Sequence, residues 1–283
     1  MRELAFLIAA VVSSALVSVL MRFSEKRTGN SMVMFLSNYI VCALLSLCFG
    51  LRGGLTAGEG TGFAAGLGVL SGVMYLGSFA LLKMNIRKNG VVLSAVFMKL
   101  GVLVPTLMAV TVYHERPGLT RVIGFAAAVL AILLINTDSS GAEGGKDRKA
   151  ALLVVLLLAG GFTDSLSNIF EKNGAASAKD LYLLVTFLSA ALISLIEAAV
   201  KRTPFTRADV ICGAMIGIPN YFSSRFLLLA LGRMSAVAVY PAYNVGAILL
   251  VTLAGVLVFR EHMSRRKWIG MAVIAASLIL LNL

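Results

Sequence analysis

The stretch HERPGLTRVIG (residues 114–124) recurs later in the chain as REHMSRRKWIG (residues 260–270), and this pair of stretches decides the fold. At an offset of 146 residues, the two copies match Glu115 with Glu261 and end on the same Ile–Gly pair. The same offset aligns further residues outside the loops, namely Tyr75 with Tyr221, Ser78 with Ser224 and Arg87 with Arg233. The sequence therefore indicates an internal repeat that extends over most of the chain.

The composition predicts that this repeat lies in a membrane. Of the 283 residues, 59% are hydrophobic and 13% are charged, and the mean hydropathy is +0.93. An average soluble domain has about 25% charged residues. We therefore expect an integral membrane protein. The location that we expect is the bacterial inner (plasma) membrane. The net charge of +12 comes mainly from Lys and Arg in short gaps between apolar runs, where such residues set membrane orientation. Because the basic residues have this role, we expect no nucleic-acid partner.

Ten apolar runs are candidates for transmembrane helices, which need about 20 residues each. They cover residues 4–21, 31–50, 62–82, 90–112, 121–137, 150–170, 181–199, 210–231, 235–258 and 268–283. The longest polar stretch lies between the fifth and sixth runs and resembles a flexible linker. The predicted fold is thus an all-α polytopic membrane protein with ten transmembrane helices in two five-helix repeats. The first repeat is residues 1–138, the linker 139–149 and the second repeat 150–283.

The odd number of helices in each repeat predicts an inverted topology. The second repeat must enter the membrane from the side opposite to the first, as in many secondary transporters, where the substrate site lies near the midplane between the halves. The loops after the odd-numbered runs carry most of the Lys and Arg residues. By the positive-inside rule, these loops lie in the cytoplasm and both termini lie outside.

The repeated motif resembles a known family. A loop with Glu and basic residues, followed by a helix that opens with Ile–Gly, is similar to the EamA-type domain pair of the ten-helix drug/metabolite transporter superfamily. Pro105, late in the fourth run, also fits. The resemblance covers the whole chain and implies a permease that works by alternating access and keeps both termini inside. It departs from the family pattern at His114 and Arg260, where Gly usually precedes the Glu.

Three charged residues lie well inside apolar runs: Lys99, Asp164 and Arg225. Because a charge at the bilayer centre costs at least about 2.5–3.5 kcal/mol, such residues face protein or water. Their depths predict that Asp164 pairs with Arg225 and that Lys99 is an unpaired cation in a wet cavity. The alternatives are that the Asp164–Arg225 pair only locks two helices together, and that Lys99 extends to the membrane interface.

Polar side chains near these charges follow helical spacing. Asn168 follows Asp164 by four residues, and the stretch YPAYN (240–244) brings two tyrosines and an asparagine to one helix face. The alternative for each of them is a hydrogen bond that holds two helices together. The full set of expected substrate-binding residues is Lys99, Asp164, Arg225, Asn168, Asn220, Tyr221, Tyr240, Tyr243, Asn244, Tyr75 and Ser78.

The expected function is secondary active transport of a small metabolite. Two cations and one carboxylate favour an anionic or zwitterionic substrate, such as an amino acid, an organic acid or a phosphorylated metabolite. A proton or a counter-substrate would drive the transport. The alternative is a proton-coupled exporter of cationic drugs or amines that uses Asp164.

A non-transporting membrane protein and an intramembrane enzyme are less favoured by the sequence. It contains no HExxH, GxSxG or ATP-binding loop motif. We therefore expect no catalytic residues. We also expect no metal or cofactor, since Cys42, Cys48 and Cys212 lack metal-ligand spacing.

Overall fold

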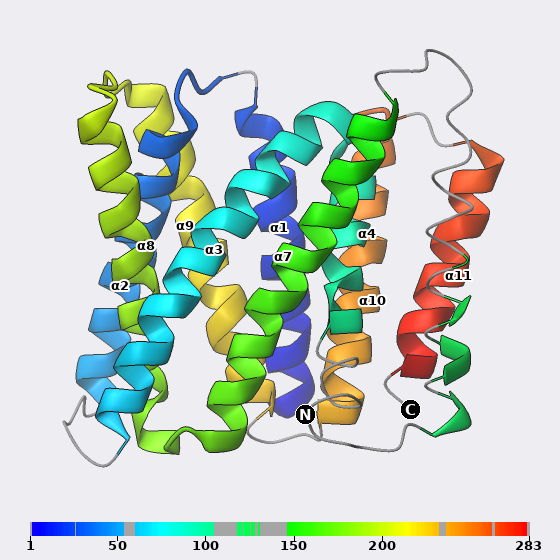
Figure 1. Ribbon diagram of the computed structural model, residues 1–283, viewed down its shortest axis with the longest axis horizontal. Coiled ribbons are helices and arrows are strands. Elements are labelled where there is room, and N and C mark those ends of the chain that lie inside the picture. The colour runs from blue at the N-terminus through cyan, green and yellow to red at the C-terminus, as the bar shows by residue number, and fades with distance from the viewer. Residues whose placement is uncertain are drawn as a thin grey trace.

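The computed structural model describes residues 2–25, 27–53, 60–104, 118–120, 122–124, 126–127, 130, 146–231, 236–261 and 264–281 (Figure 1). Every regular element in these ranges is a helix, which confirms the predicted all-α class. The elements are α1 (Arg2–Ser24), α2 (Ser31–Gly53), α3 (Thr61–Asn89), α4 (Val91–Lys99), the 3₁₀ helix η1 (Leu100–Val102), α7 (Lys146–Asn173), the 3₁₀ helix η2 (Ala176–Ala178), α8 (Lys179–Val200), α9 (Arg207–Leu231), α10 (Ala236–Leu257) and α11 (Arg265–Leu281).

Within the described residues, five helices are long and apolar enough to cross a membrane: Leu4–Ser24, Ser31–Leu51, Thr61–Asn89, Ala150–Ser167 and Lys179–Val200. Shorter apolar helices cover Val91–Val102, Tyr243–Leu257 and Trp268–Ser277. Helix α3 has 29 residues, which gives a length of about 43 Å. Because this exceeds the roughly 30 Å of a hydrocarbon core, the helix must tilt, and Figure 1 shows α3 crossing the bundle obliquely.

Two helix boundaries differ from the expected runs. Gly90 alone joins α3 to α4 and has a φ of +84°, a conformation that glycine adopts without steric cost. The expected run 90–112 then changes to a 3₁₀ helix at Leu100, and its remainder from Pro105 onward lies outside the described residues. Helix α7 begins at Lys146 rather than at residue 150, because Lys and Arg are good helix formers and extend it into the expected linker.

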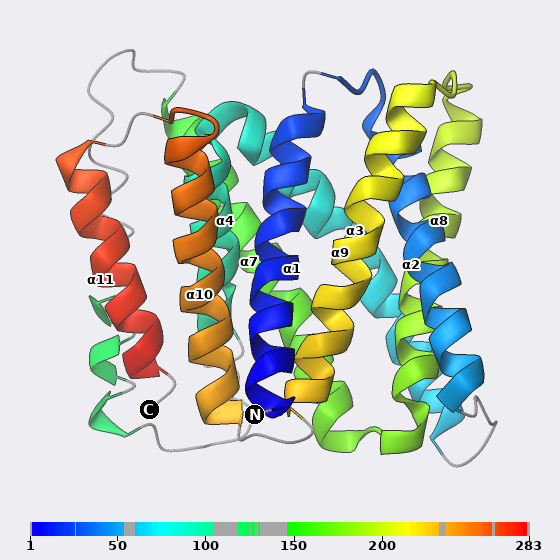
Figure 2. The same cartoon turned by 180° about the vertical axis from the view of Figure 1, so that it is seen from behind.

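Helices from the first half of the chain (α1 to α4) pack against helices from the second half (α7 to α10). Helix α2 contacts α8 and α9, and α1 contacts α9 and α10. Helix α3 contacts α7 and α8, and α4 contacts α7 and α10. The centre of the bundle is therefore enclosed by helices of both halves, and Figure 2 shows α1 between α10 and α9.

One face of the bundle carries much of the positive charge. Helices α1, α3, α8 and α10 end at the face where α2, α4, α7 and α9 begin (Figure 1). We call it the basic face, because the described residues there, 22–25, 27–30, 83–89, 200–209, 259–261 and 264–267, are rich in Lys and Arg. The other end of the bundle is the opposite face.

Close helix contacts require glycine at particular positions. A Cβ atom on Gly72 of α3 would lie 2.5 Å from the carbonyl oxygen of Thr186 and 2.7 Å from the Cβ of Ser189, both on α8. A Cβ atom on Gly66 of the same helix would meet nothing within 4 Å. Gly72 therefore permits the approach of α3 to α8, whereas Gly66 does not contribute to it.

We predict opposite effects of alanine at these two positions. Gly72→Ala should lower the midpoint of thermal unfolding, because overpacking costs about 1–3 kcal/mol. Gly66→Ala should leave the midpoint unchanged or raise it, since alanine is favoured over glycine in helices by up to about 1 kcal/mol. Circular dichroism of the detergent-purified variants measures both midpoints. Equal midpoints for the two variants would contradict this account of the α3–α8 contact.

Candidate functional site

A cavity of about 130 Å³ lies between the helices of the two halves. Residues of α1, α3, α4, α7, α8, α9 and α10 line it. One buried water requires about 10–15 Å³, so the cavity has room for roughly ten waters or for one small metabolite. Its polar lining residues are Ser14, Ser18, Tyr75, Ser78, Lys99, Thr163, Asp164, Ser167, Tyr182, Thr186, Asn220, Ser223, Ser224 and Tyr243.

A close crossing of two helices places both charged residues of the cavity. A Cβ atom on Gly101 would lie 2.5 Å from the backbone nitrogen of Gly161, so the backbones of η1 and α7 touch here. Lys99 precedes this contact by two residues and Asp164 follows it by three. Both side chains line the cavity, and that of Asp164 is accessible to solvent. The crossing therefore sets a cation and a carboxylate on the wall of the same cavity.

The Lys99 ammonium group lies against an aromatic ring. Its Nζ is 3.9 Å from the ring centroid of Tyr243 on α10, which is a cation–π contact. The Tyr243 hydroxyl shares a hydrogen bond of 3.0 Å with the Oγ of Ser223 on α9. Lys99 also interacts electrostatically with Asp164, although no ion pair within 4.0 Å joins them among the described contacts. Both charged groups are thus left with capacity for a further partner.

Hydroxyl and amide groups in the wall are held by bonds between helices. Ser78 of α3 and Thr163 of α7 share a hydrogen bond of 2.9 Å. Thr163 also donates to the carbonyl oxygen of Ala159, so Ser78 is the donor in the shared bond. On the other side of the cavity, Asn220 Nδ2 of α9 donates to Asn38 Oδ1 of α2 at 3.3 Å. These bonds fix the polar wall between helices of both halves.

The structure corrects the expected pairing of Arg225. Its NH1 donates to Asp180 Oδ1 at the start of α8, at 2.8 Å, and to the Tyr221 hydroxyl at 2.9 Å. Its guanidinium also lies over the Phe49 ring, 4.7 Å from the centroid. The expected Asp164–Arg225 pair is therefore wrong, and Arg225 is not among the described residues that line the cavity.

The pairing of Asp164 with Arg225 was inferred from depth relative to the middle of each run, which ignores helix tilt and the level at which helices touch. Lys99 does lie on the cavity wall without an ion pair among the described contacts, as expected. The contact between Gly101 and Gly161 brings Lys99 and Asp164 to the same wall.

The other expected residues divide into three groups. Tyr75, Ser78, Asn220 and Tyr243 line the cavity together with Lys99 and Asp164. Tyr221 and Asn244 are buried and, in the described part of the chain, do not belong to the lining. The side chains of Asn168 and Tyr240 lie outside the described residues.

Several polar residues of the wall were missed by the sequence reasoning. Small hydroxyl residues line it from α1, α7, α8 and α9, namely Ser14, Ser18, Thr163, Ser167, Thr186, Ser223 and Ser224, together with Tyr182. On α1, α7 and α8 they recur at a spacing of four residues, and on α9 they lie three and four residues after Asn220, as residues on one helix face do. That spacing was the available signal. It is weak by itself because Ser and Thr are common in transmembrane helices, where their hydroxyls bond to the backbone.

Comparisons with known proteins agree with the fold. One solved structure, titled "Crystal structure of protein", superposes with a TM-score of 0.63 at 14% identity, covering 99% of this chain and 98% of its own. An uncharacterized protein of Haemophilus influenzae is 26% identical over 272 residues, which are 93% of this chain and 92% of that protein.

A shorter match has a functional name. It is the probable 4-amino-4-deoxy-L-arabinose-phosphoundecaprenol flippase subunit ArnE of Pseudomonas fluorescens, 38% identical over 55 residues. These residues are 19% of this chain and 47% of that subunit. The family model described as the EamA-like transporter family matches residues 1–137. Together with the apolar helices, this match confirms the resemblance seen in the sequence: over residues 1–137 the chain is similar to the EamA-like transporter family, and it has the apolar helices of a membrane protein.

Proposed function

We propose that the chain is a secondary active transporter for a small zwitterionic metabolite, whose carboxylate binds Lys99 and whose ammonium group binds Asp164. The observation that carries the proposal is the presence of both charged side chains on the wall of one cavity. Tyr75, Tyr243 and Asn220 would complete the recognition through hydroxyl and amide groups.

The charge of the cavity supports a zwitterion over an anion. Arg225 already has a carboxylate partner in Asp180. This leaves one cation and one carboxylate among the described lining residues. A singly charged substrate would leave one of these two charges without a partner. An organic acid or a phosphorylated metabolite therefore fits the site less well than an amino acid.

The magnitude of the interaction favours a substrate with both charges. A pair of unit charges at 4 Å interacts by about 4 kcal/mol at an effective dielectric constant of about 20. A zwitterion gains this interaction twice, and it replaces only the longer-range attraction between Lys99 and Asp164. Loss of either partner should therefore remove one of the two interactions, which is about half of this electrostatic gain.

The transport mechanism that we propose is alternating access between two inverted five-helix repeats, residues 1–138 and 150–283, joined by the linker 139–149 in a ten-helix chain. The contacts support it, because they occur in matched pairs. The contact of α1 with α9 corresponds to that of α7 with α3, and the contact of α1 with α10 corresponds to that of α7 with α4. In Figure 1, α1 and α7 run in opposite directions, as an inverted repeat requires.

The residues that line the cavity support the same proposal. At the offset of 146 residues, Ser14, Val17 and Ser18 of α1 correspond to Gly160, Thr163 and Asp164 of α7, and all six line the cavity. Ser78 and Leu82 likewise correspond to Ser224 and Leu228. The cavity would therefore lie on the pseudo-two-fold axis, where such transporters bind their substrates. We place the protein in a bacterial inner membrane, with a proton or a counter-substrate as the coupled species.

A second candidate is export of cationic amines coupled to protons through Asp164. The solvent-accessible carboxylate in the cavity favours it. The partial similarity to a flippase subunit named for an amino-sugar lipid is a further reason to test amines. In this candidate, Asp164 binds the amine and the proton in turn, and Lys99 has no substrate group to hold.

Variants of the two charged residues distinguish these candidates. For a zwitterion, both Lys99→Ala and Asp164→Asn should lower uptake of radiolabelled neutral amino acids into proteoliposomes at least about tenfold, which corresponds to about 1.4 kcal/mol. Lys201→Ala is the matched control, because Lys201 pairs with Glu197 at the end of α8, away from the cavity. If uptake of a radiolabelled amine persists in Lys99→Ala and disappears in Asp164→Asn, the result would favour amine transport instead.

The proposal also predicts which ligands stabilise the purified protein. A bound ligand at 100 times its dissociation constant stabilises by about 2.7 kcal/mol. Leucine, with both charges, should therefore raise the unfolding temperature. Isopentylamine, which lacks the carboxylate, and 4-methylpentanoate, which lacks the amine, should have little effect. A larger shift with isopentylamine than with any amino acid would contradict the zwitterion site.

A further inference from the structure

We infer that Glu261 is the latch that closes the cavity toward the basic face by holding the start of α4. The inference rests on the alternating access proposed above. It concerns a residue that is outside the cavity and that acts on Lys99 through α4.

The cavity is sealed toward the basic face by a layer of buried side chains. One helical turn from Ser18, Leu82 and Ala95, in the direction of that face, lie Met21, Ile86 and Val91. Each of these three is 0% exposed. On α10, Gly255 lies one turn from the lining residue Val251, and a Cβ atom on it would be 2.3 Å from Val92. Buried side chains of α1, α3 and α4 and a close contact between α10 and α4 therefore separate the cavity from the basic face.

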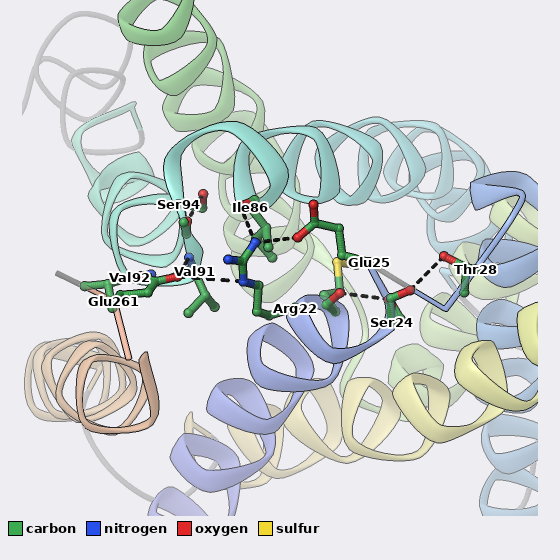
Figure 3. Close-up of polar contacts among 11 residues, drawn as sticks. Arg22, Ser24, Glu25, Thr28, Ile86, Val91, Val92, Ser94 and Glu261 are labelled. Atoms are coloured by element: carbon green, nitrogen blue, oxygen red, sulfur yellow. Dashed lines mark hydrogen bonds and ion pairs between the residues drawn. The ribbon is translucent and has the colours of Figure 1, made fainter. Parts of the chain in front are cut away.

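The carboxylate of Glu261 contacts the start of α4, at Val91 and Val92 (Figure 3). Its Oε1 accepts a hydrogen bond from the backbone nitrogen of Val91 at 2.7 Å, and its Oε2 accepts one from that of Val92 at 3.3 Å. The first four backbone N–H groups of a helix have no partner within the helix, and a carboxylate there also interacts favourably with the helix dipole. Glu261, which follows α10 in the second half, therefore caps a helix of the first half.

An arginine extends this contact to two more helices. The Nε of Arg22, near the end of α1, lies 3.9 Å from Glu261 Oε1. Its NH1 donates to the carbonyl oxygen of Ile86 on α3 at 3.2 Å and also pairs with Glu25. Figure 3 shows these side chains meeting at the start of α4. The ends of α1 and α3 are thereby held to the same carboxylate as α4.

The backbone before α4 is shaped for this carboxylate. A Cβ atom on Gly90 would lie 2.8 Å from Glu261 Oε2 and 2.9 Å from Oε1, so only glycine leaves room for the contact. Gly90 also supplies no side-chain cap of its own, which leaves the helix N–H groups to Glu261. In the sequence, Glu261 is the residue that the repeat aligns with Glu115, which lies outside the described residues.

The latch is connected to the binding site by a short rigid helix. Helix α4 has nine residues, with Val91 at its first position and Lys99 at its last. The distance between these ends is about 12 Å. Access from the basic face requires the ends of α1, α3, α4 and α10 to separate, and this separation breaks the bonds between Glu261 and α4. Release of the latch therefore opens the cavity and moves Lys99 in the same step.

A thiol-accessibility experiment tests the latch without a substrate. Ser18→Cys, on the cavity wall near the sealed end, is introduced into a chain whose three native cysteines are replaced by alanine. A membrane-impermeant maleimide is then added from the basic face of oriented vesicles. Glu261→Gln keeps the side-chain shape and removes the charge, and it should accelerate labelling at least about tenfold through a shift toward the open state. Glu197→Gln is the matched control, since it removes a carboxylate at the same face that pairs with Lys201 on its own helix end.

A second variant disrupts the contact between Glu261 and the start of α4 by changing Gly90 instead of Glu261. Gly90→Ala should displace the carboxylate and accelerate labelling to a similar extent, and the double variant should exceed neither single one. Labelling at equal rates in Glu261→Gln and Glu197→Gln, with Gly90→Ala also unchanged, would overturn the inference. Gel filtration and circular dichroism verify that the variants are folded. If labelling changes as expected while Lys99→Ala and Asp164→Asn still transport amino acids, the zwitterion site fails and the latch stands.

Discussion

The electrostatic cost of two charges inside a bundle of apolar helices governs the arrangement of this protein. An unpaired charge in hydrocarbon costs several kcal/mol, so each charged group must meet protein, water or a ligand. Lys99 and Asp164 meet this requirement by facing one cavity from either side of the contact between Gly101 and Gly161. The close approach of two glycine backbones is therefore the structural condition for the whole site.

The charges toward the two ends of the bundle are compensated differently from those at its centre. Arg225 pairs with Asp180 and lies over an aromatic ring, and Glu261 binds two backbone N–H groups beside Arg22. These groups have their partners within the protein and join helices of the two halves or adjacent helices. At the centre, a cation–π contact and a longer-range attraction leave room for a ligand. We interpret the outer contacts as structural or conformational, and the centre as the place of recognition.

Much of this could be predicted from the sequence, because it depends on local composition and periodicity. The apolar runs gave the helical class, and the repeated loop motif indicated the family. The partner of Arg225 was predicted wrongly, since depth along a run ignores helix tilt and the level at which helices touch. The cap on α4 could not be foreseen either, because Glu261 and Val91 are 170 residues apart and Gly90 identifies their contact only in three dimensions. The hydroxyl groups of the wall were missed because Ser and Thr have ordinary structural roles in such helices.

A crystal or cryo-electron-microscopy structure of the chain with a bound amino acid tests the central claim most directly. The account predicts that the ligand carboxylate lies within about 3 Å of the Lys99 ammonium group and the ligand amine within about 3 Å of the Asp164 carboxylate, as charge-assisted hydrogen bonds require. A ligand bound elsewhere, with Lys99 and Asp164 joined directly to each other in an empty cavity, would contradict it.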